Sequence, residues 1–395
     1  KPTDGESSHF KPTDGESSRF KPTDGESSRI KPIDGAADAA VECVRLVISS
    51  GNALPGAFGG VPTSRQLCGL WWMDFVVHDS VQPASPFRTA LVDHCDLMLS
   101  SRDSGGEAGC ETRDRALDVW GRMRRAWACA DLRPADDANA TLISHTPGVF
   151  SAVATHGQVP KGSGALRACF QRALKHPGER LDLAVIAHSC SGWAVGGDGE
   201  ERFREWCAAA APNGGAVRFH WPRRADPSLF GEGRMAQSRG VRDCSMPEWV
   251  RHLRLVRLRL RRDVLCPSEG KEYMCTPHLM LYILHEPLAA ADELPRIRRI
   301  LLTSANLSAA PWGYSKGSDE IEVRSFELGI CVEPARPSEL VEPLGEAMAL
   351  GPRWSEGHAR AIPFHFGGPG VACDDPFIGR ALVRGPTEER GHLNY

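Results

Sequence analysis

Short apolar runs rich in β-branched residues alternate with helical stretches between residues 164 and 332, and this alternation constrains the fold more than any other feature. The predicted strands lie at residues 181–187, 216–220, 298–303 and 325–332, and the predicted helices at residues 164–175 and 199–210. Strands that alternate with helices pack as layers, with the helices covering a sheet. The sequence therefore predicts an α/β fold.

Further elements are predicted nearer the N-terminus. Residues 44–48 form a β-branched run, and residues 68–75 form a second strand candidate. A helix is predicted around residues 113–130 because apolar residues recur there at helical spacing. Residues 131–139 are polar, and we interpret them as a linker.

Residues 254–262 alternate Arg with apolar residues and fit two kinds of structure. A period of two would place Arg257, Arg259 and Arg261 on one face of a strand. A period of 3.6 gives an apolar helix face, and the length of the segment from Met246 favours the helix. Its basic face is either solvated or a stripe that contacts phosphates.

Residues 1–30 are three near-copies of a decapeptide that begins Lys-Pro-Thr-Asp-Gly-Glu-Ser-Ser, and a fourth copy starts at Lys31. Each copy offers at most one large apolar residue, which is too little buried surface to offset the entropy of ordering. We predict a disordered tail over residues 1–40; a partner-binding repeat is the alternative. The remaining chain is divided into residues 41–139 and 140–395.

Composition limits the classes of function. The net charge of −3 and the pI of about 6.6 are unlike those of a strongly basic nucleic-acid-binding domain, although a local basic groove stays compatible with them. None of the 13 Cys residues falls in a Cys-x-x-Cys pair, so we expect no metal. Scattered thiols indicate a reducing compartment, the nucleus or cytosol. No apolar run has the length of a membrane span, so we expect no membrane partner.

A His, an Asn and a Glu stand in an order that suits phosphate chemistry. His278 lies in Pro-His-Leu-Met-Leu-Tyr, Asn306 lies in the Ser-rich run Leu-Thr-Ser-Ala-Asn-Leu-Ser after a strand, and Glu327 lies in Arg-Ser-Phe-Glu-Leu-Gly. An imidazole transfers protons near neutral pH, an amide holds a phosphoryl oxygen, and a carboxylate orients an imidazole. An unpaired carboxylate in an apolar strand is costly, so Glu327 should have a partner.

The order and the residues of these three motifs resemble the second half-site of the tyrosyl-DNA phosphodiesterase family, a branch of the phospholipase D superfamily. Weaker matches occur in the same order at residues 44–52, 66–71, 143–150, 189–192, 362–364 and 374–377. The resemblance implies a phospholipase D-like fold of two similar α/β halves. Each half has a mixed β-sheet flanked by helices, the active site lies in the seam, and the first half is truncated here.

The resemblance also implies roles for individual residues. His278 takes the general acid/base position. The other positions are those that hold the phosphate (Asn306 and Asn52), support the His rings (Glu327 and Gln66) and lie near the DNA backbone (Ser308 and Ser189). In the family a first His attacks phosphorus and a second protonates the leaving phenol, without a metal. No cofactor is expected.

The chain departs from the family pattern at two positions. Met280 stands where the second His-x-Lys motif has its Lys, and no His stands in the stretch before Asn52 where the first motif is expected. The literal His9-Phe10-Lys11 lies inside the repeats, and the neighbouring copies have Arg in place of His9. Whether the chain is an enzyme therefore stays open. Met280→Lys alone is expected to raise activity only modestly.

The resemblance implies a phosphoric diester hydrolase that removes tyrosyl (topoisomerase I) adducts from DNA 3′ ends in DNA repair, impaired in this chain. The alternative is a non-catalytic DNA-end-binding or scaffold protein derived from the family. The expected partners are single-stranded or nicked DNA 3′ ends with a covalent peptide or tyrosine adduct. We expect a monomer in the nucleus.

Overall fold

The computed structural model of the chain describes a defined set of residues. They are residues 42–50, 65–100, 107–133, 135, 139–151, 160–186, 199–221, 255–257, 275–287, 296–316, 320–333 and 348–350. The decapeptide repeats, Asn52 and Ser189 lie outside them. The tail predicted at residues 1–40 therefore stays a prediction.

Within the described residues, seven strands form one mixed sheet, here named the central sheet. Its order is β3 (Thr141–His145), β13 (Glu327–Val332), β10 (Ile297–Thr303), β9 (Leu281–His285), β5 (Asp182–Ile186), β6 (Val217–Trp221) and β7 (Leu255–Arg257). Neighbours are antiparallel from β3 to β5, and β5, β6 and β7 run parallel. The four strands predicted from the apolar runs are confirmed as β5, β6, β10 and β13.

The helix favoured for residues 254–262 is wrong where the chain is described. Residues 255–257 form strand β7, in which Leu255 pairs with Phe219 and Arg257 with Trp221 of β6. A short amphipathic segment satisfies both periods, and the open edge of β6 supplies hydrogen-bond partners that a helix would not use. Tertiary pairing therefore decides the structure of this segment.

A second sheet is built on a long antiparallel hairpin, here named the outer sheet. β1 (Cys43–Ser49) pairs with β2 (Arg65–Val76), which confirms both strands predicted in this region. β2 also pairs in parallel with β8 (Cys275–His278) and β14 (Met348–Leu350), so strands from distant sequence complete this sheet. A small sheet joins β11 (Tyr314–Ser315), β12 (Glu320–Val323) and β4 (Gly148–Ser151).

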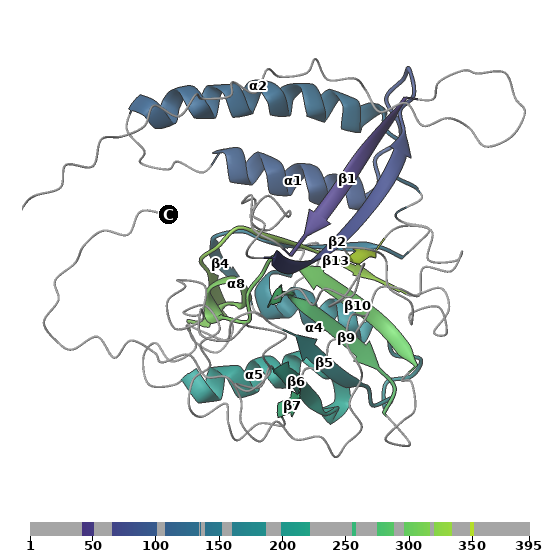
Figure 1. The fold of residues 1–395 in the computed structure, drawn as a ribbon, viewed down its shortest axis with the longest axis vertical. Helices are drawn as coiled ribbons and strands as arrows, with labels where there is room; N and C mark the ends of the chain where they lie inside the picture. The colour runs from purple at the N-terminus through teal and green to yellow at the C-terminus, as the bar shows by residue number, and fades with distance from the viewer. Residues whose placement is uncertain are drawn as a thin grey trace, which may run out of the picture.

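Helices lie on both sides of the central sheet. α1 (Pro86–Ser100) and α2 (Glu107–Cys129) lie next to the β1–β2 hairpin, and α4 (Gly162–Gln171) and α5 (Gly199–Ala210) lie on the other side (Figure 1). The structure confirms the helices predicted at 113–130, 164–175 and 199–210; α1 is an addition. None of the helices in the described ranges combines the length and hydrophobicity needed to cross a membrane.

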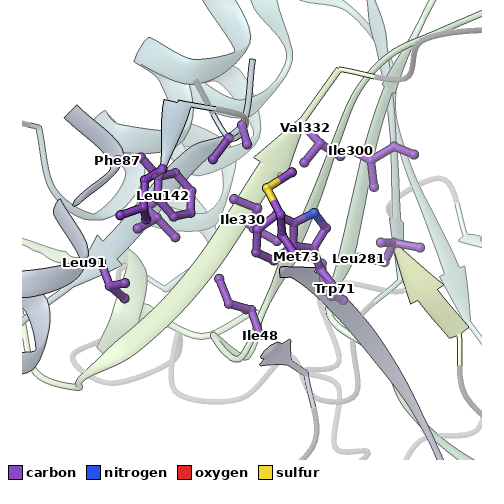
Figure 2. Packing of buried hydrophobic residues seen from close by; sticks show 14 of the residues in the cluster. Ile48, Trp71, Met73, Phe87, Leu91, Leu142, Leu281, Ile300, Ile330 and Val332 are labelled. Carbon is purple, nitrogen blue, oxygen red and sulfur yellow. The ribbon is translucent and has the colours of Figure 1, made fainter. Parts of the chain in front are cut away.

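Two apolar cores lie on the two faces of the central sheet, because alternate residues of a strand point to opposite faces. Leu281 and Ile283 belong to the first core, and Met280, Tyr282 and Leu284 to the second. The first core is shared with β1, β2, α1 and α2, and Figure 2 shows sheet residues such as Ile330 beside residues of the hairpin. The second core is shared with α4 and α5. The fold is thus a mixed α/β fold in layers.

The linker predicted at residues 131–139 packs against the first core where it is described. Leu132 is 1% exposed and Ala135 is fully buried. The backbone amide of Asp131 donates to the carbonyl of Val76 at 2.9 Å, which ties this segment to β2. Among the described positions, the exposed Arg133 and Asn139 alternate with these two buried residues, so Leu132 and Ala135 belong to the core and not to a solvated linker. The division of the chain at residue 139 stays a prediction.

Candidate functional site

The topology brings several strand ends to one end of the central sheet, here named the site end. Glu327, the first residue of β13, pairs with His145, the last of β3, and Thr303 at the end of β10 pairs with Gly329. The start of β9 lies at the same end, because Leu281 pairs with Leu302. Asn306 follows β10 by three residues and His278 precedes β9 by three residues. The chain therefore reaches the site end at His278, Asn306 and Glu327.

Asn306 lies in a turn whose backbone is held on both sides. Its carbonyl accepts a hydrogen bond from the Ser308 amide at 2.8 Å and one from Nε1 of Trp312 at 2.9 Å. Trp312 is 1% exposed, so the turn is anchored to the second core. The side-chain Oδ1 of Asn306 is buried without a hydrogen-bond partner among the described residues. A buried amide oxygen without a partner can accept a hydrogen bond from an additional donor group.

Ser308 starts the short helix α8 (Ala309–Trp312) as its N-cap residue. Its side chain makes no capping hydrogen bond, although Ser at this position commonly makes one. The hydroxyl of Ser308 is therefore not committed to holding the helix, which is compatible with the DNA-contacting position that the family resemblance implies.

Glu327 is a partly buried carboxyl group with one short hydrogen bond. The Ser304 hydroxyl donates to its Oε2 at 2.5 Å, and the Leu328 amide donates to Ser304 Oγ at 3.1 Å. Burial raises the pKa of Glu327 to about 7, and the hydrogen bond from Ser304 opposes this rise. The expected partner of Glu327 in the described residues is thus a serine. A carboxyl group with this pKa both gives and takes protons near neutral pH.

His278 and Gln66 lie on neighbouring strands of the outer sheet. In the parallel pair of β2 and β8, His278 pairs with Cys68 and Thr276 pairs with Gln66. The backbones of His278 and Gln66 are therefore two register positions apart. This placement joins a residue assigned to the second half-site with one assigned to the first. Their roles stay predictions, as does that of Asn52.

Met280 is 1% exposed and belongs to the second core. The resemblance places it where the family has a Lys. In this chain the position is packed among apolar side chains, including Tyr282 and Trp206. A cation there would lose its hydration, so the sequence around Met280 is adapted to an apolar residue.

A second polar cluster at the site end was not predicted. Ser144 Oγ lies 2.9 Å from Nδ1 of His94 and 3.3 Å from Nζ of Lys161. Burial, with help from the charge of Lys161, lowers the pKa of His94 to about 4. Burial also lowers the pKa of Lys161, against the effect of Asp93. At neutral pH the imidazole of the cluster is therefore neutral, and the hydroxyl of Ser144 accepts a hydrogen bond from Lys161 Nζ.

His145 borders this cluster from the other face of β3. It is fully buried, and its ring packs edge-on against Trp312 with centroids 4.9 Å apart. Burial lowers its pKa to about 3; a backbone contact with Pro311 opposes this, and Lys161 and His94 add to it. His145 is thus neutral at pH 7 and occupies the position next to Ser144 and opposite Glu327.

Sequence spacing gave no signal for this cluster. His94 lies on α1, Ser144 on β3 and Lys161 at the N-cap of α4, so three separate elements contribute. Ser144 and His145 fall in the stretch 143–150 that resembles the family, but neither stands in a motif of its own. Within the described ranges, no group of three or more His, Cys, Asp or Glu residues is arranged to hold a metal ion.

These observations define a mixed α/β protein with a carboxyl, an amide and a neutral imidazole at one end of its central sheet. The sequence model of the family described as tyrosyl-DNA phosphodiesterase matches residues 245–358, the segment that carries His278, Asn306, Ser308 and Glu327. This match confirms the family recognised in the sequence, and the segment is of the tyrosyl-DNA phosphodiesterase family.

Solved structures of a yeast tyrosyl-DNA phosphodiesterase are similar at low identity. One matches with 11% identity and a TM-score of 0.43, covering 74% of this chain and 64% of that chain. A His-to-Asn mutant of the yeast enzyme matches with 10% identity and a TM-score of 0.46, covering 74% and 65%. The chain thus spans less than two thirds of the length of these proteins. Comparison with curated proteins finds no match.

Proposed function

We propose that this chain is a phosphoric diester hydrolase of the tyrosyl-DNA phosphodiesterase type that removes tyrosyl adducts from DNA 3′ ends. The observation that supports this most strongly is that the segment matched by the family carries Asn306 and Glu327 to the sheet end that the chain also reaches at His278. In this proposal residues 41–139 and 140–395 correspond to two phospholipase D-like halves. DNA repair in the nucleus is the proposed setting.

The proposed chemistry is displacement at phosphorus. Such reactions depend on positioning and on stabilising the charge of the phosphoryl oxygens. The Asn306 amide would hold a phosphoryl oxygen, and Glu327, half-protonated near pH 7, would exchange a proton with the leaving or entering oxygen. His278 takes the acid/base role that the resemblance implies. Ser308 would contact the DNA backbone.

Turnover should be slow. The apolar, buried Met280 gives no positive charge to the phosphate. Loss of one preorganised charge-stabilising group typically lowers the rate about 10²–10³-fold. Loss of the His nucleophile that the family resemblance implies should lower it further.

The second candidate function is binding of DNA ends without cleavage. The burial of Met280 favours this second function, because an apolar core residue stands where the family has a Lys. A chain that had lost its chemistry would keep the turn at Asn306 and the N-cap Ser308 for contacts with the DNA backbone.

A single assay series separates the two functions. The substrate is a single-stranded oligonucleotide with a 3′-phosphotyrosine; cleavage is followed on gels and binding by fluorescence anisotropy. Slow cleavage that falls at least tenfold in Asn306→Ala and Glu327→Gln supports the hydrolase. The matched control is Glu333→Gln, which removes an exposed carboxylate just past the other end of β13.

Each result of the cleavage and binding assays supports or contradicts a different function. Binding with no detectable cleavage at enzyme excess supports the non-catalytic function. Cleavage that survives both site substitutions unchanged would show that the residues are misassigned. Neither binding nor cleavage would contradict both functions.

A further inference from the structure

In the His94–Ser144–Lys161 cluster, the Ser144 hydroxyl has the surroundings of an activated nucleophile. A protonated lysine only donates hydrogen bonds, so Ser144 Oγ accepts from Lys161 Nζ at 3.3 Å. The hydrogen of the hydroxyl is then available to Nδ1 of His94, which lies 2.9 Å away and is neutral. A hydroxyl between a proton acceptor and a cation is the arrangement of nucleophilic serines.

The three side chains are held by their surroundings. His94 is 5% exposed, and its ring packs edge-on against Phe326, the neighbour of Glu327, with centroids 6.3 Å apart. Ser144 is 9% exposed and lies on β3, the edge strand of the central sheet. Lys161 is only half-buried, so the cluster reaches solvent at this residue. The hydroxyl is thus fixed, yet close to the surface.

The start of α4 fixes the lysine. Lys161 is the N-cap residue, and Gly162 follows it with a φ of +57°. A Cβ on Gly162 would lie 2.6 Å from the carbonyl oxygen of Trp312. The backbone beside Lys161 therefore rests directly on the short helix that follows Asn306. This contact connects the cluster to the turn of the candidate site.

We propose that Ser144 is a catalytic nucleophile of this site, with His94 as its proton acceptor and Lys161 as the cation that stabilises the hydroxyl oxygen and the phosphoryl group. The inference rests on the proposed function for its substrate class, which is a phosphodiester with a phenolic leaving group. It supplies the nucleophile that the sequence lacks at the position implied by the resemblance.

The two steps balance. Ser144 Oγ attacks phosphorus, its proton passes to His94 Nδ1, and the bond from phosphorus to the phenolic oxygen breaks. In-line displacement places the leaving oxygen opposite Oγ, so its proton comes from a second group, for which we assign the protonated Glu327. Water then attacks the phosphoserine diester and gives its proton to Glu327. Ser144 Oγ leaves and regains its proton from His94.

The test uses an alkyl fluorophosphonate, which labels activated serines with loss of fluoride and needs no DNA. The full chain is incubated with the probe, and the adduct is located by peptide mass spectrometry. We expect labelling at Ser144, none at this position in Ser144→Ala, and a rate at least tenfold lower in His94→Asn and Lys161→Met, since a general base contributes about 10²–10⁴-fold. Ser100→Ala is the control, because Ser100 is an exposed serine on α1 whose hydroxyl only donates to the Leu97 carbonyl.

Folding and function are read separately. Thermal unfolding of each variant shows whether a loss of labelling reflects loss of structure, and Lys161→Arg, which keeps the charge, should retain part of the rate. Absence of a Ser144 adduct in folded protein would overturn the inference. So would DNA cleavage that traps its covalent intermediate elsewhere, although the proposed function would then stand. Labelling at Ser144 without any cleavage of 3′-phosphotyrosine DNA would support the nucleophile and contradict the proposed hydrolase.

Discussion

At the scale of single residues, burial decides which protonation states the site end holds at neutral pH. The pKa of Glu327 is raised to about 7, whereas the pKa of His94 is lowered to about 4. Both shifts have burial as their largest cause, because removal from water disfavours the charged form of either group. A neutral imidazole and a half-protonated carboxyl group are therefore available together near pH 7. A carboxyl group whose pKa is raised to about 7 is typical of acid–base sites.

The shift of Glu327 makes stability depend on pH. From its ordinary value of 4.5 up to about 7, the folded protein keeps a proton on Glu327 that the unfolded chain releases, so the free energy of unfolding falls as pH rises through this window. The loss totals about 3 kcal/mol, at about 1.4 kcal/mol per pKa unit. Urea unfolding of the wild type and Glu327→Gln at several pH values should show a difference that grows between pH 4.5 and 8 and is then constant. Buried histidines affect both proteins equally, so parallel curves would contradict the shift.

Met280 tests the packing at the lysine position. We expect Met280→Lys to lower the free energy of unfolding by about 3–5 kcal/mol, because it leaves an unpaired charge in the second core. This stability loss accompanies the modest gain in activity expected from the restored charge. Met280→Leu is the matched control and should change stability by less than about 1.5 kcal/mol. Chemical denaturation measures both; a Met280→Lys protein as stable as the wild type would show that the side chain reaches solvent.

At the scale of elements, the start of α4 should tolerate no side chain at Gly162. Alanine there would adopt a left-handed conformation and press its Cβ against the Trp312 carbonyl, so Gly162→Ala should destabilise by about 2 kcal/mol or more. Gly121 in α2 is the matched control, since a Cβ there meets nothing within 4 Å. Gly121→Ala should stabilise by about 0.5–1 kcal/mol. A lower melting temperature for Gly162→Ala and a higher one for Gly121→Ala would confirm the close approach of Gly162 to the Trp312 carbonyl. Equal changes in melting temperature would refute it.

The elements that could be predicted from sequence are those whose apolar residues form a clear run or recur at one clear period. β5, β10 and β13 are short apolar runs, largely buried on both faces, and their length favours strands over helices. α1 was missed because its buried face includes Arg88 and His94, which break the apolar period. Its start did carry a signal, since Ser85 caps the Arg88 amide at 3.1 Å and Pro86 follows.

The candidate site could be predicted only where its residues share a motif. Asn306 and Glu327 stand in short sequence motifs that resemble those of the family. Ser144, His94 and Lys161 meet through the packing of α1 and α4 against β3, and such a meeting has no sequence period. Burial, which sets their pKa values, is likewise a property of the folded chain.

At the scale of the whole molecule, the first core joins the two regions on either side of residue 139. β2 contributes Trp71 and Met73, α1 contributes Phe87 and Leu91, and the central sheet contributes the opposing residues. β8 and β14, from the later region, complete the outer sheet by pairing with β2. The two predicted halves are thus interleaved through a core and through a sheet.

This sharing predicts that residues 140–395 alone do not fold stably. The central sheet and the segment before β9 contribute ten large aliphatic residues to the first core: Leu142, Ile186, Leu279, Leu281, Ile283, Ile297, Ile300, Leu302, Ile330 and Val332. Burial of each contributes about 1.5–3 kcal/mol, so exposing them costs on the order of 15 kcal/mol or more. That matches or exceeds the whole stability of a typical domain, about 5–15 kcal/mol.

The measurement compares three preparations: the full chain, residues 140–395 alone, and residues 140–395 co-expressed with residues 41–139. The isolated segment should bind a hydrophobic dye and show no cooperative thermal transition. Co-expression should restore the transition, because the β1–β2 hairpin and α1 again cover the sheet. A sharp transition in the isolated segment would mean that the central sheet is stable without this cover, and that residue 139 separates two independently folding units.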